Sequence, residues 1–168
     1  MEMANPHDGM VSFQEWLTRG MLEIGPVEGF QDLYSHIDEP TPGEPRLTYV
    51  HLTPDRQWVT AFLTCVMNGY IDDSPCVSVG YAVPEELRND GRAKSILKDV
   101  ISDQLSNARR AGHQSVYFEA VADVTNLASQ RVASAVLGGI IESIVDTASG
   151  RPAYRYTAHF DTSSGARI

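Results

Sequence analysis

The sequence lacks several features that mark whole classes of protein. Its 168 residues include two cysteines, Cys65 and Cys76, too few for a disulfide scaffold, so we expect reduced thiols and a cytoplasmic location. No apolar run approaches the ~18 residues that a membrane-spanning helix needs. Residues 1–6 also lack the basic and apolar stretches of a signal peptide. We therefore expect a cytoplasmic protein with no membrane association.

Motifs of metal and hydrolase chemistry are also missing. The histidines show no metal-ligand spacing and the two cysteines are far apart, so we expect no zinc site. No Gly-x-Ser-x-Gly elbow occurs, which argues against a serine hydrolase. The histidines are His7, His36, His51, His113 and His159.

Charge of opposite sign gathers in two segments of a chain whose net charge is −9. Residues 1–45 hold a single base, Arg19, among many acids, and residues 88–110 are rich in bases. We do not expect nucleic acid as the main partner, because a protein that binds it needs a broad basic face. A small polyanion bound at one place fits the basic segment better. The acids are Glu2, Asp8, Glu15, Glu23, Glu28, Asp32, Asp38, Glu39 and Glu44, and the bases are Arg88, Arg92, Lys94, Lys98, Arg109 and Arg110.

Apolar periodicity and turn residues predict the order ααβββαβαββ. The first helix is expected at residues 13–24, capped by Ser12, and the second at residues 28–37. Further helices are expected at 91–111 and 126–137, and strands at 47–52, 58–67, 77–83, 116–121, 140–145 and 153–160. A helix starting at Thr53-Pro54 is the alternative to the strand at 58–67. This order predicts an α+β or α/β protein with a mixed sheet flanked by helices.

The loop between the strand at 77–83 and the helix from Gly91 has the features of an anion site. The first N–H groups of a helix have no acceptor within it, and the helix dipole adds positive potential there. The loop and helix start read Arg88, Asn89, Asp90, Gly91, Arg92, Ala93 and Lys94, whose basic side chains can pair with phosphate oxygens. The pattern is neither a Walker loop nor a dinucleotide fingerprint. An ordinary helix start with solvated arginines is the alternative.

Arg88-x-x-Gly91-x-Ala93 resembles the Gln/Arg-x-x-Gly-x-Gly/Ala loop of the GNAT N-acetyltransferases. The resemblance implies that residues 88–94 bind the pyrophosphate of acetyl-CoA. It also implies that backbone groups of Tyr81 and Val83 bind the pantetheine arm.

A second segment, residues 118–132, is similar to a strand and helix of the RimJ/RimL-like branch of that family. Its Asn126-x-x-Ser129-x-x-Val132 pattern implies that Asn126 and Ser129 lie near the cofactor thiol. The resemblance is best over residues 77–139, the acetyl-CoA-binding core, and implies one GNAT domain over residues 1–168. Residues 1–45 correspond to the variable acceptor-binding region.

The chain departs from the family at the groups that transfer protons. Many members carry a tyrosine where this sequence has Ala133, or Ser134 with a shift of one residue. Ser129 is therefore the candidate hydrogen-bond donor to the leaving thiolate, and Glu119 the candidate base, directly or through water. A structural pairing of Glu119 with Arg131 or Arg155 is the alternative for that carboxylate.

These features together predict an acetyl-CoA-dependent N-acetyltransferase in which a primary amine attacks the thioester directly, within a ternary complex. The acids of residues 1–45 favour a cationic small molecule or a peptide N-terminus as acceptor. Two alternatives remain: a non-catalytic CoA-binding protein, and a toxin that acetylates aminoacyl-tRNA, which the acidic N-terminal third disfavours. The sequence leaves a homodimer open.

Overall fold

The computed structural model describes residues 5–168 and places eight strands and three α-helices in them. The helices are α1 (Pro6–Thr18), α2 (Arg92–Arg110) and α3 (Leu127–Val136), with a short 3₁₀ helix, η1, at Glu85–Leu87. The strands are β1 (Gly25–Pro26), β2 (Leu33–Thr41), β3 (Glu44–Leu52), β4 (Val59–Ile71), β5 (Ser74–Ala82), β6 (Ser115–Asp123), β7 (Ile140–Val145) and β8 (Pro152–Asp161). None of these helices is long and apolar enough to cross a bilayer.

Hydrogen bonding joins the strands into a mixed sheet in the order β1-β2-β3-β4-β5-β6-β8-β7. The pair β5 and β6 is parallel, whereas β6 with β8 and β7 with β8 are antiparallel. The mixed α+β class expected from the sequence is thereby confirmed. That residues 1–168 act as one GNAT domain stays a prediction.

Contacts divide the described chain into two compact units. The N-terminal unit comprises residues 5–66 and 80–100, and the C-terminal unit comprises residues 67–79 and 101–168. Strands β4 and β5 and helix α2 each begin in one unit and end in the other.

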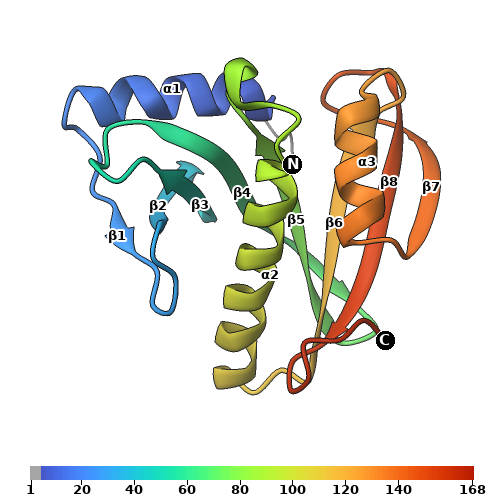
Figure 1. Ribbon diagram of the computed structural model, residues 1–168. Coiled ribbons are helices and arrows are strands. Elements are labelled where there is room, and N and C mark those ends of the chain that lie inside the picture. Colours follow the sequence, from blue (N-terminus) through green and yellow to red (C-terminus); the bar gives the residue numbers. More distant parts are fainter. Residues whose placement is uncertain (1–4) are drawn as a thin grey trace. The chain divides into compact units, whose positions relative to one another are not determined.

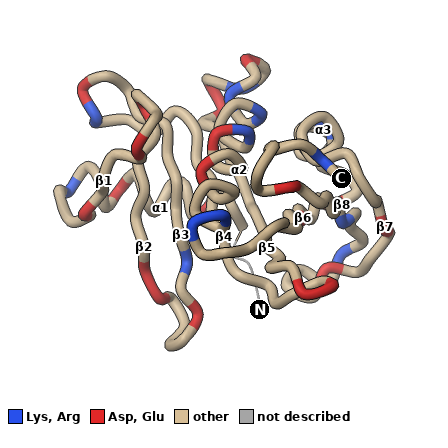
Figure 2. The backbone as a smooth tube through the Cα atoms, turned by 90° about the horizontal axis from the view of Figure 1, so that it is seen from below, with Lys and Arg blue, Asp and Glu red and all other residues tan. Residues whose placement is uncertain are grey.

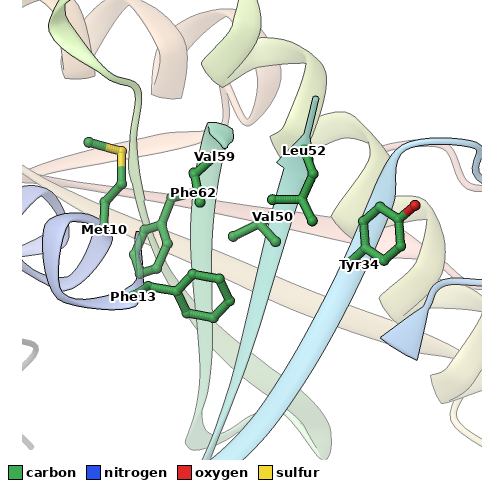
Figure 3. Close-up of a cluster of buried hydrophobic side chains, with 7 residues drawn as sticks. All are labelled: Met10, Phe13, Tyr34, Val50, Leu52, Val59 and Phe62. Atoms are coloured by element: carbon green, nitrogen blue, oxygen red, sulfur yellow. The ribbon is translucent and has the colours of Figure 1, made fainter. Parts of the chain in front are cut away.

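An apolar cluster between α1 and three strands forms a core of the N-terminal unit (Figure 3). Phe13 of α1 meets Phe62 of β4 edge to face, with ring centroids 5.9 Å apart. Burying such aromatic side chains is a main source of stability in a small unit. The cluster consists of Met10, Phe13, Tyr34, Val50, Leu52, Val59 and Phe62.

Helix α1 starts and ends earlier than the predicted helix at residues 13–24, so those bounds were wrong. Asn5 caps it by accepting a hydrogen bond from the His7 N–H at 3.0 Å, and Pro6 occupies the first turn, where its missing N–H costs nothing. Gly20, at a φ of 67°, follows its end. Residues 1–4 of the loose terminus expected from the sequence lie outside the described residues.

The helix predicted at residues 28–37 was also wrong, because strand β2 occupies its second half. Strand β2 pairs with β3 from Leu33↔His51 to Asp38↔Arg46, and Leu33 and Tyr34 are buried by that pairing. Helical spacing of apolar residues is a local signal, and tertiary pairing overrides it here. The alternative helix after Thr53-Pro54 is a turn instead, so the order begins with one helix followed by five strands.

In the C-terminal unit, α3 lies alongside β6 and β8, and β7 forms the outer edge of the sheet (Figure 1). Phe118 of β6 and Phe160 of β8 meet edge to face at 5.6 Å, and Ala133 and Val136 are the buried residues of α3. The predicted bounds of the strand at residues 140–145 match those of β7.

Candidate functional site

The predicted anion loop lies between the end of β5 and the first turn of α2, in the N-terminal unit. Helix η1 follows Pro84, and the chain then passes through Asn89 and Gly91, at φ values of 63° and 71°. The left-handed region is open to glycine and tolerated by asparagine. A Cβ atom at Gly91 would meet no other atom within 4 Å, so the backbone is open to a ligand at this position.

The first turn of α2 presents backbone donors that the helix itself leaves unused. The Ser95 N–H donates to the Gly91 carbonyl at 3.0 Å, which makes Gly91 the residue that caps the helix. The N–H groups of Arg92, Ala93 and Lys94 precede this bond and therefore have no acceptor within the helix. Together with the helix dipole they favour an anion at this end of α2.

The basic side chains beside these donors are held in different ways. Arg88 Nε donates to the Val83 carbonyl at 3.2 Å, which ties its side chain to the end of β5. Arg92 Nε forms an ion pair with Asp90 Oδ2 at 3.5 Å. The Nε atom is buried and makes no hydrogen bond among the described residues. Lys94 is exposed. A buried guanidinium nitrogen that makes no hydrogen bond is costly even beside a carboxylate, so the phosphate oxygens of a bound ligand fit this place.

Glu119 of β6 lies in the C-terminal unit and is 8% exposed. Its carboxylate accepts hydrogen bonds from Ser78 Oγ of β5 at 2.6 Å and from Asn68 Nδ2 of β4. The parallel register places Ser78 directly beside Glu119. Arg155 pairs with Glu142 at 3.2 Å, and neither Arg131 nor Arg155 forms an ion pair with Glu119 within residues 5–168.

The Glu119 carboxylate also acts on Cys76, a buried residue of β5. Burial raises the pKa of the Cys76 thiol to about 12, and the charge of Glu119 and a hydrogen bond with it add to that rise. At neutral pH this thiol keeps its proton and is not a nucleophile. Glu119 is therefore enclosed by hydrogen-bond donors of β4 and β5.

The turn from β6 into α3 is organised by Asp123. Its carboxylate accepts hydrogen bonds from the Thr125 N–H at 2.8 Å and Oγ1 at 2.7 Å, and these bonds lower the pKa of Asp123, aided by Arg151 at 3.0 Å. Gln130, which the sequence did not single out, donates from Nε2 to the carbonyls of Asp123 and Val124, each at 3.0 Å. The start of α3 is thus fixed to the end of β6.

Asn126 is the cap of α3. Its Oδ1 accepts a hydrogen bond from the Ser129 N–H at 3.1 Å, which gives this asparagine a structural role besides the cofactor contact expected of it. Ala133, at the place where many GNAT members have a tyrosine, is fully buried, whereas Ser134 is exposed.

The residues predicted from the sequence fall into two groups. Tyr81, Val83 and residues 88–94 belong to the N-terminal unit, and Glu119, Asn126 and Ser129 to the C-terminal unit. Within its own unit, the first group surrounds the start of α2, and the second lies along β6 and at the start of α3.

Asp32, His51 and Asp99 form a polar cluster in the N-terminal unit that sequence reasoning missed. Their ligand atoms lie within 4.8 Å of one another, and His51 Nε2 is 2.9 Å from Asp99 Oδ2. Asp32 comes from the bend just before β2, His51 from β3 and Asp99 from α2, so no spacing in the sequence signals them. The expectation that metal ligands are absent rested on such spacing alone.

The acids of the N-terminal unit are partly neutralised. Glu15 pairs with Arg19 at 2.6 Å, and Asp38 accepts two hydrogen bonds from Arg46, at 2.6 and 3.0 Å. Other acidic positions recur around β1 and β2 (Figure 2). Glu23, Glu28, Asp32 and Glu39 among them are exposed.

Comparison with known proteins gives matches in structure alone. No protein-family model matches the chain, and no curated protein matches its sequence. A ribosomal-protein-S5-alanine acetyltransferase from Vibrio fischeri matches with a TM-score of 0.52 and 12% identity, over 72% of this chain and 64% of that one. An aminoglycoside N(6′)-acetyltransferase from Legionella pneumophila also gives 0.52 and 12%, over 75% and 67%. This chain has the fold of the GNAT acetyltransferases.

A third structure, a GNAT-family acetyltransferase from Streptococcus pneumoniae, gives a TM-score of 0.50 and 10% identity, over 67% of this chain and 65% of that one. At these identities the likeness concerns the GNAT fold and not a substrate. The GNAT fold agrees with the resemblance of the sequence to GNAT motifs.

Proposed function

We propose that the protein is an acetyl-CoA-dependent N-acetyltransferase acting on a primary amine. The observation that carries the proposal is the start of α2, where the buried Arg92 Nε makes no hydrogen bond, is 3.5 Å from Asp90 Oδ2, and lies next to backbone N–H groups that the helix leaves unused. This set of donors fits a pyrophosphate, and it follows a β5 strand in a GNAT fold. We place the protein in the RimJ/RimL-like branch and in the cytoplasm as part of the same proposal.

The residues around α2 would hold the cofactor. Arg88, Arg92 and Lys94 would pair with phosphate oxygens, while Asn89, Asp90, Gly91 and Ala93 shape a backbone that comes close to them. The backbone groups of Tyr81 and Val83 would bind the pantetheine arm. Acetyl-CoA, when bound, supplies an acyl group activated as a thioester.

Glu119 and Ser129 are the proposed catalytic residues. Ser78 and Asn68 orient the Glu119 carboxylate, which would accept the proton of the acceptor ammonium directly or through water. The Ser129 hydroxyl would donate a hydrogen bond toward the cofactor sulfur, since α3 carries no tyrosine at the family position. Asn126 would hold the first turn of α3 in place for this contact.

The acceptor is proposed to be cationic, either a small amine or a peptide N-terminus. The exposed acids of the N-terminal unit would raise the local concentration of a cation. A non-catalytic CoA-binding protein is the second candidate, and the buried Ala133 in the place of the tyrosine is the observation that favours it.

Release of free CoA thiol in the presence of a panel of amines separates the two candidates. We expect amine-dependent thiol release, with cationic acceptors faster than anionic ones and the preference weakening as salt is added. CoA binding without turnover of any amine would support the non-catalytic protein. Faster turnover of anionic acceptors at low ionic strength would contradict the proposed acceptor class.

A further inference from the structure

Asp32, His51 and Asp99 bring three possible metal-ligand atoms together in the N-terminal unit. Val50 and Leu52 of β3 belong to the apolar cluster that contains residues of α1 (Figure 3), so His51 between them points to the opposite face of β3. On that face its Nε2 meets Asp99 Oδ2 of α2 at 2.9 Å. The cluster therefore lies where α2 contacts this strand.

The pairing of β2 with β3 brings the Asp32 side chain to the same place. Leu33, the residue after Asp32, lies opposite His51 in the register. The Leu52 N–H also donates a hydrogen bond to the Asp32 carbonyl at 3.2 Å. As a result the three ligand atoms lie within 4.8 Å of one another, although the residues are far apart along the chain.

The two carboxylates of this cluster are not balanced by a lysine or an arginine. Within residues 5–168, neither Asp32 nor Asp99 forms an ion pair with such a side chain. Their neighbour is His51, which can carry one positive charge at most. Two carboxylates that share a site repel each other, so a divalent cation beside a neutral imidazole would balance the charges completely.

The buried imidazole distinguishes this cluster from a group of surface acids, since His51 is 6% exposed. One imidazole nitrogen and two carboxylate oxygens form a ligand set that suits Zn²⁺, and three protein ligands leave a fourth position for water. The ligand atoms of a tetrahedral zinc ion lie about 3.3 Å apart. His51 Nε2 and Asp99 Oδ2 are already that close, and the exposed Asp32 has room to approach them.

We propose that His51 Nε2 and one carboxylate oxygen each of Asp32 and Asp99 bind one divalent transition-metal ion such as Zn²⁺. The ion would link α2 to β3 and to the bend before β2, and so stabilise the N-terminal unit. The alternative is a hydrogen bond between His51 and Asp99 that binds no metal, in which Asp32 has no part.

Calorimetric titration of Zn²⁺ into the metal-free protein tests the site. We expect one ion per chain for the wild type and at least tenfold weaker binding for Asp32→Asn and for Asp99→Asn, because each loses a charged ligand. Asparagine keeps an oxygen that can accept a hydrogen bond from His51, so both variants should fold. Glu28→Gln, which removes an exposed acid just before Asp32 in the sequence, is the matched control and should bind like the wild type.

Three results of this titration would overturn the proposal. They are no Zn²⁺ binding by the wild type, unchanged affinity in either aspartate variant, and a loss of equal size in Glu28→Gln. The last result would mean that the ion is attracted by the acidic surface in general.

Thermal unfolding separates the metal site from a hydrogen bond between His51 and Asp99. Zn²⁺ at roughly a hundredfold excess over its Kd should raise the Tm of the wild type by about 5 °C or more, and leave the Tm of Asp32→Asn unchanged. Mg²⁺ at the same concentration should raise the Tm less, because it prefers oxygen ligands and keeps its waters. An equal rise in the wild type and Asp32→Asn, or a rise with Mg²⁺ as large as that with Zn²⁺, would overturn this ligand set.

Discussion

The start of α2 and the surroundings of Glu119 differ in whether their hydrogen-bond donors have acceptors within the protein. At the start of α2 the first backbone N–H groups have no acceptor within the helix, and the buried Arg92 Nε makes no hydrogen bond, with Asp90 Oδ2 3.5 Å away. At Glu119 the donors meet an acceptor of the protein itself, since Ser78 and Asn68 both bond to its carboxylate. The first region has a buried donor that makes no hydrogen bond, whereas the donors around Glu119 bond to an acceptor of the protein itself. We therefore expect the start of α2 to contribute more to the binding of a ligand than the surroundings of Glu119.

The largest effect is expected from Gly91→Glu, which should abolish CoA binding. The new carboxylate would repel the pyrophosphate, and a φ of 71° strains any side chain at this position. Gly112→Glu is the matched control at the other end of α2, with a φ of 92° and equally open space. Calorimetry should show lost CoA binding for the first variant and retained binding for the second. Equal CoA affinity of the two variants would contradict a CoA site at the start of α2.

Glu119→Gln should lower turnover by about 10²- to 10⁴-fold, which is the range of a general base. The variant keeps an oxygen acceptor for Ser78 and Asn68, so the fold should survive the change. The acidic limb of the pH–rate profile should flatten, because the group that must lose its proton is gone.

A structural role for Glu119 would give a different result. Glu119→Gln would then lower the free energy of unfolding, measured by denaturant titration, while the rate and the pH profile of the folded fraction stayed intact. That outcome would leave proton removal to water or to another group.

Ser129→Ala should lower turnover by about ten- to a hundredfold and leave CoA affinity nearly unchanged, because one hydrogen-bond donor toward the sulfur is removed. Ser134→Ala is the matched control, an exposed serine on the same helix. Steady-state rates and calorimetry together check this prediction. A loss of the same size in Ser134→Ala would show that the effect comes from α3 as a whole.

The smallest effect concerns stability at alkaline pH. Because burial and Glu119 raise the pKa of Cys76 from 9.0 to about 12, the unfolded chain loses this proton before the folded one does. Its contribution is intact below pH 9 and declines as the pH rises from about 9 to about 12. Denaturant titrations across this window should show a shallower decline for Cys76→Ala than for the wild type. Parallel declines would mean that the folded protein does not raise the pKa of this thiol.

The parts of the fold that local signals encode were predicted well. The bounds of β7 match the prediction, and α2 lies within a residue of its predicted start and end, with Gly112 just beyond it. The region of residues 13–41 was predicted poorly, because the cap at Asn5 and the pairing of β2 with β3 both outweigh apolar spacing. Strand pairing over a hairpin depends on partners that helical periodicity does not register.

The same difference between local and long-range signals applies to the candidate site. The anion loop could be predicted because its residues are contiguous and the features that favour an anion are local to one helix start, and its ligand stays a prediction. The partners of Glu119 were missed because Asn68 and Ser78 are 51 and 41 positions away from it along the chain. The cluster of Asp32, His51 and Asp99 was missed for the same reason.

Calorimetric titration of CoA into Arg92→Met tests whether the start of α2 binds the cofactor, with Arg109→Met at the other end of α2 as the control. Methionine keeps much of the side-chain bulk and removes the buried Nε that has no acceptor. We expect the wild type and Arg109→Met to bind CoA alike and Arg92→Met to bind it at least tenfold more weakly, because one charge-assisted hydrogen bond is lost. Equal affinity in all three proteins, or no CoA binding by the wild type, would contradict this expectation.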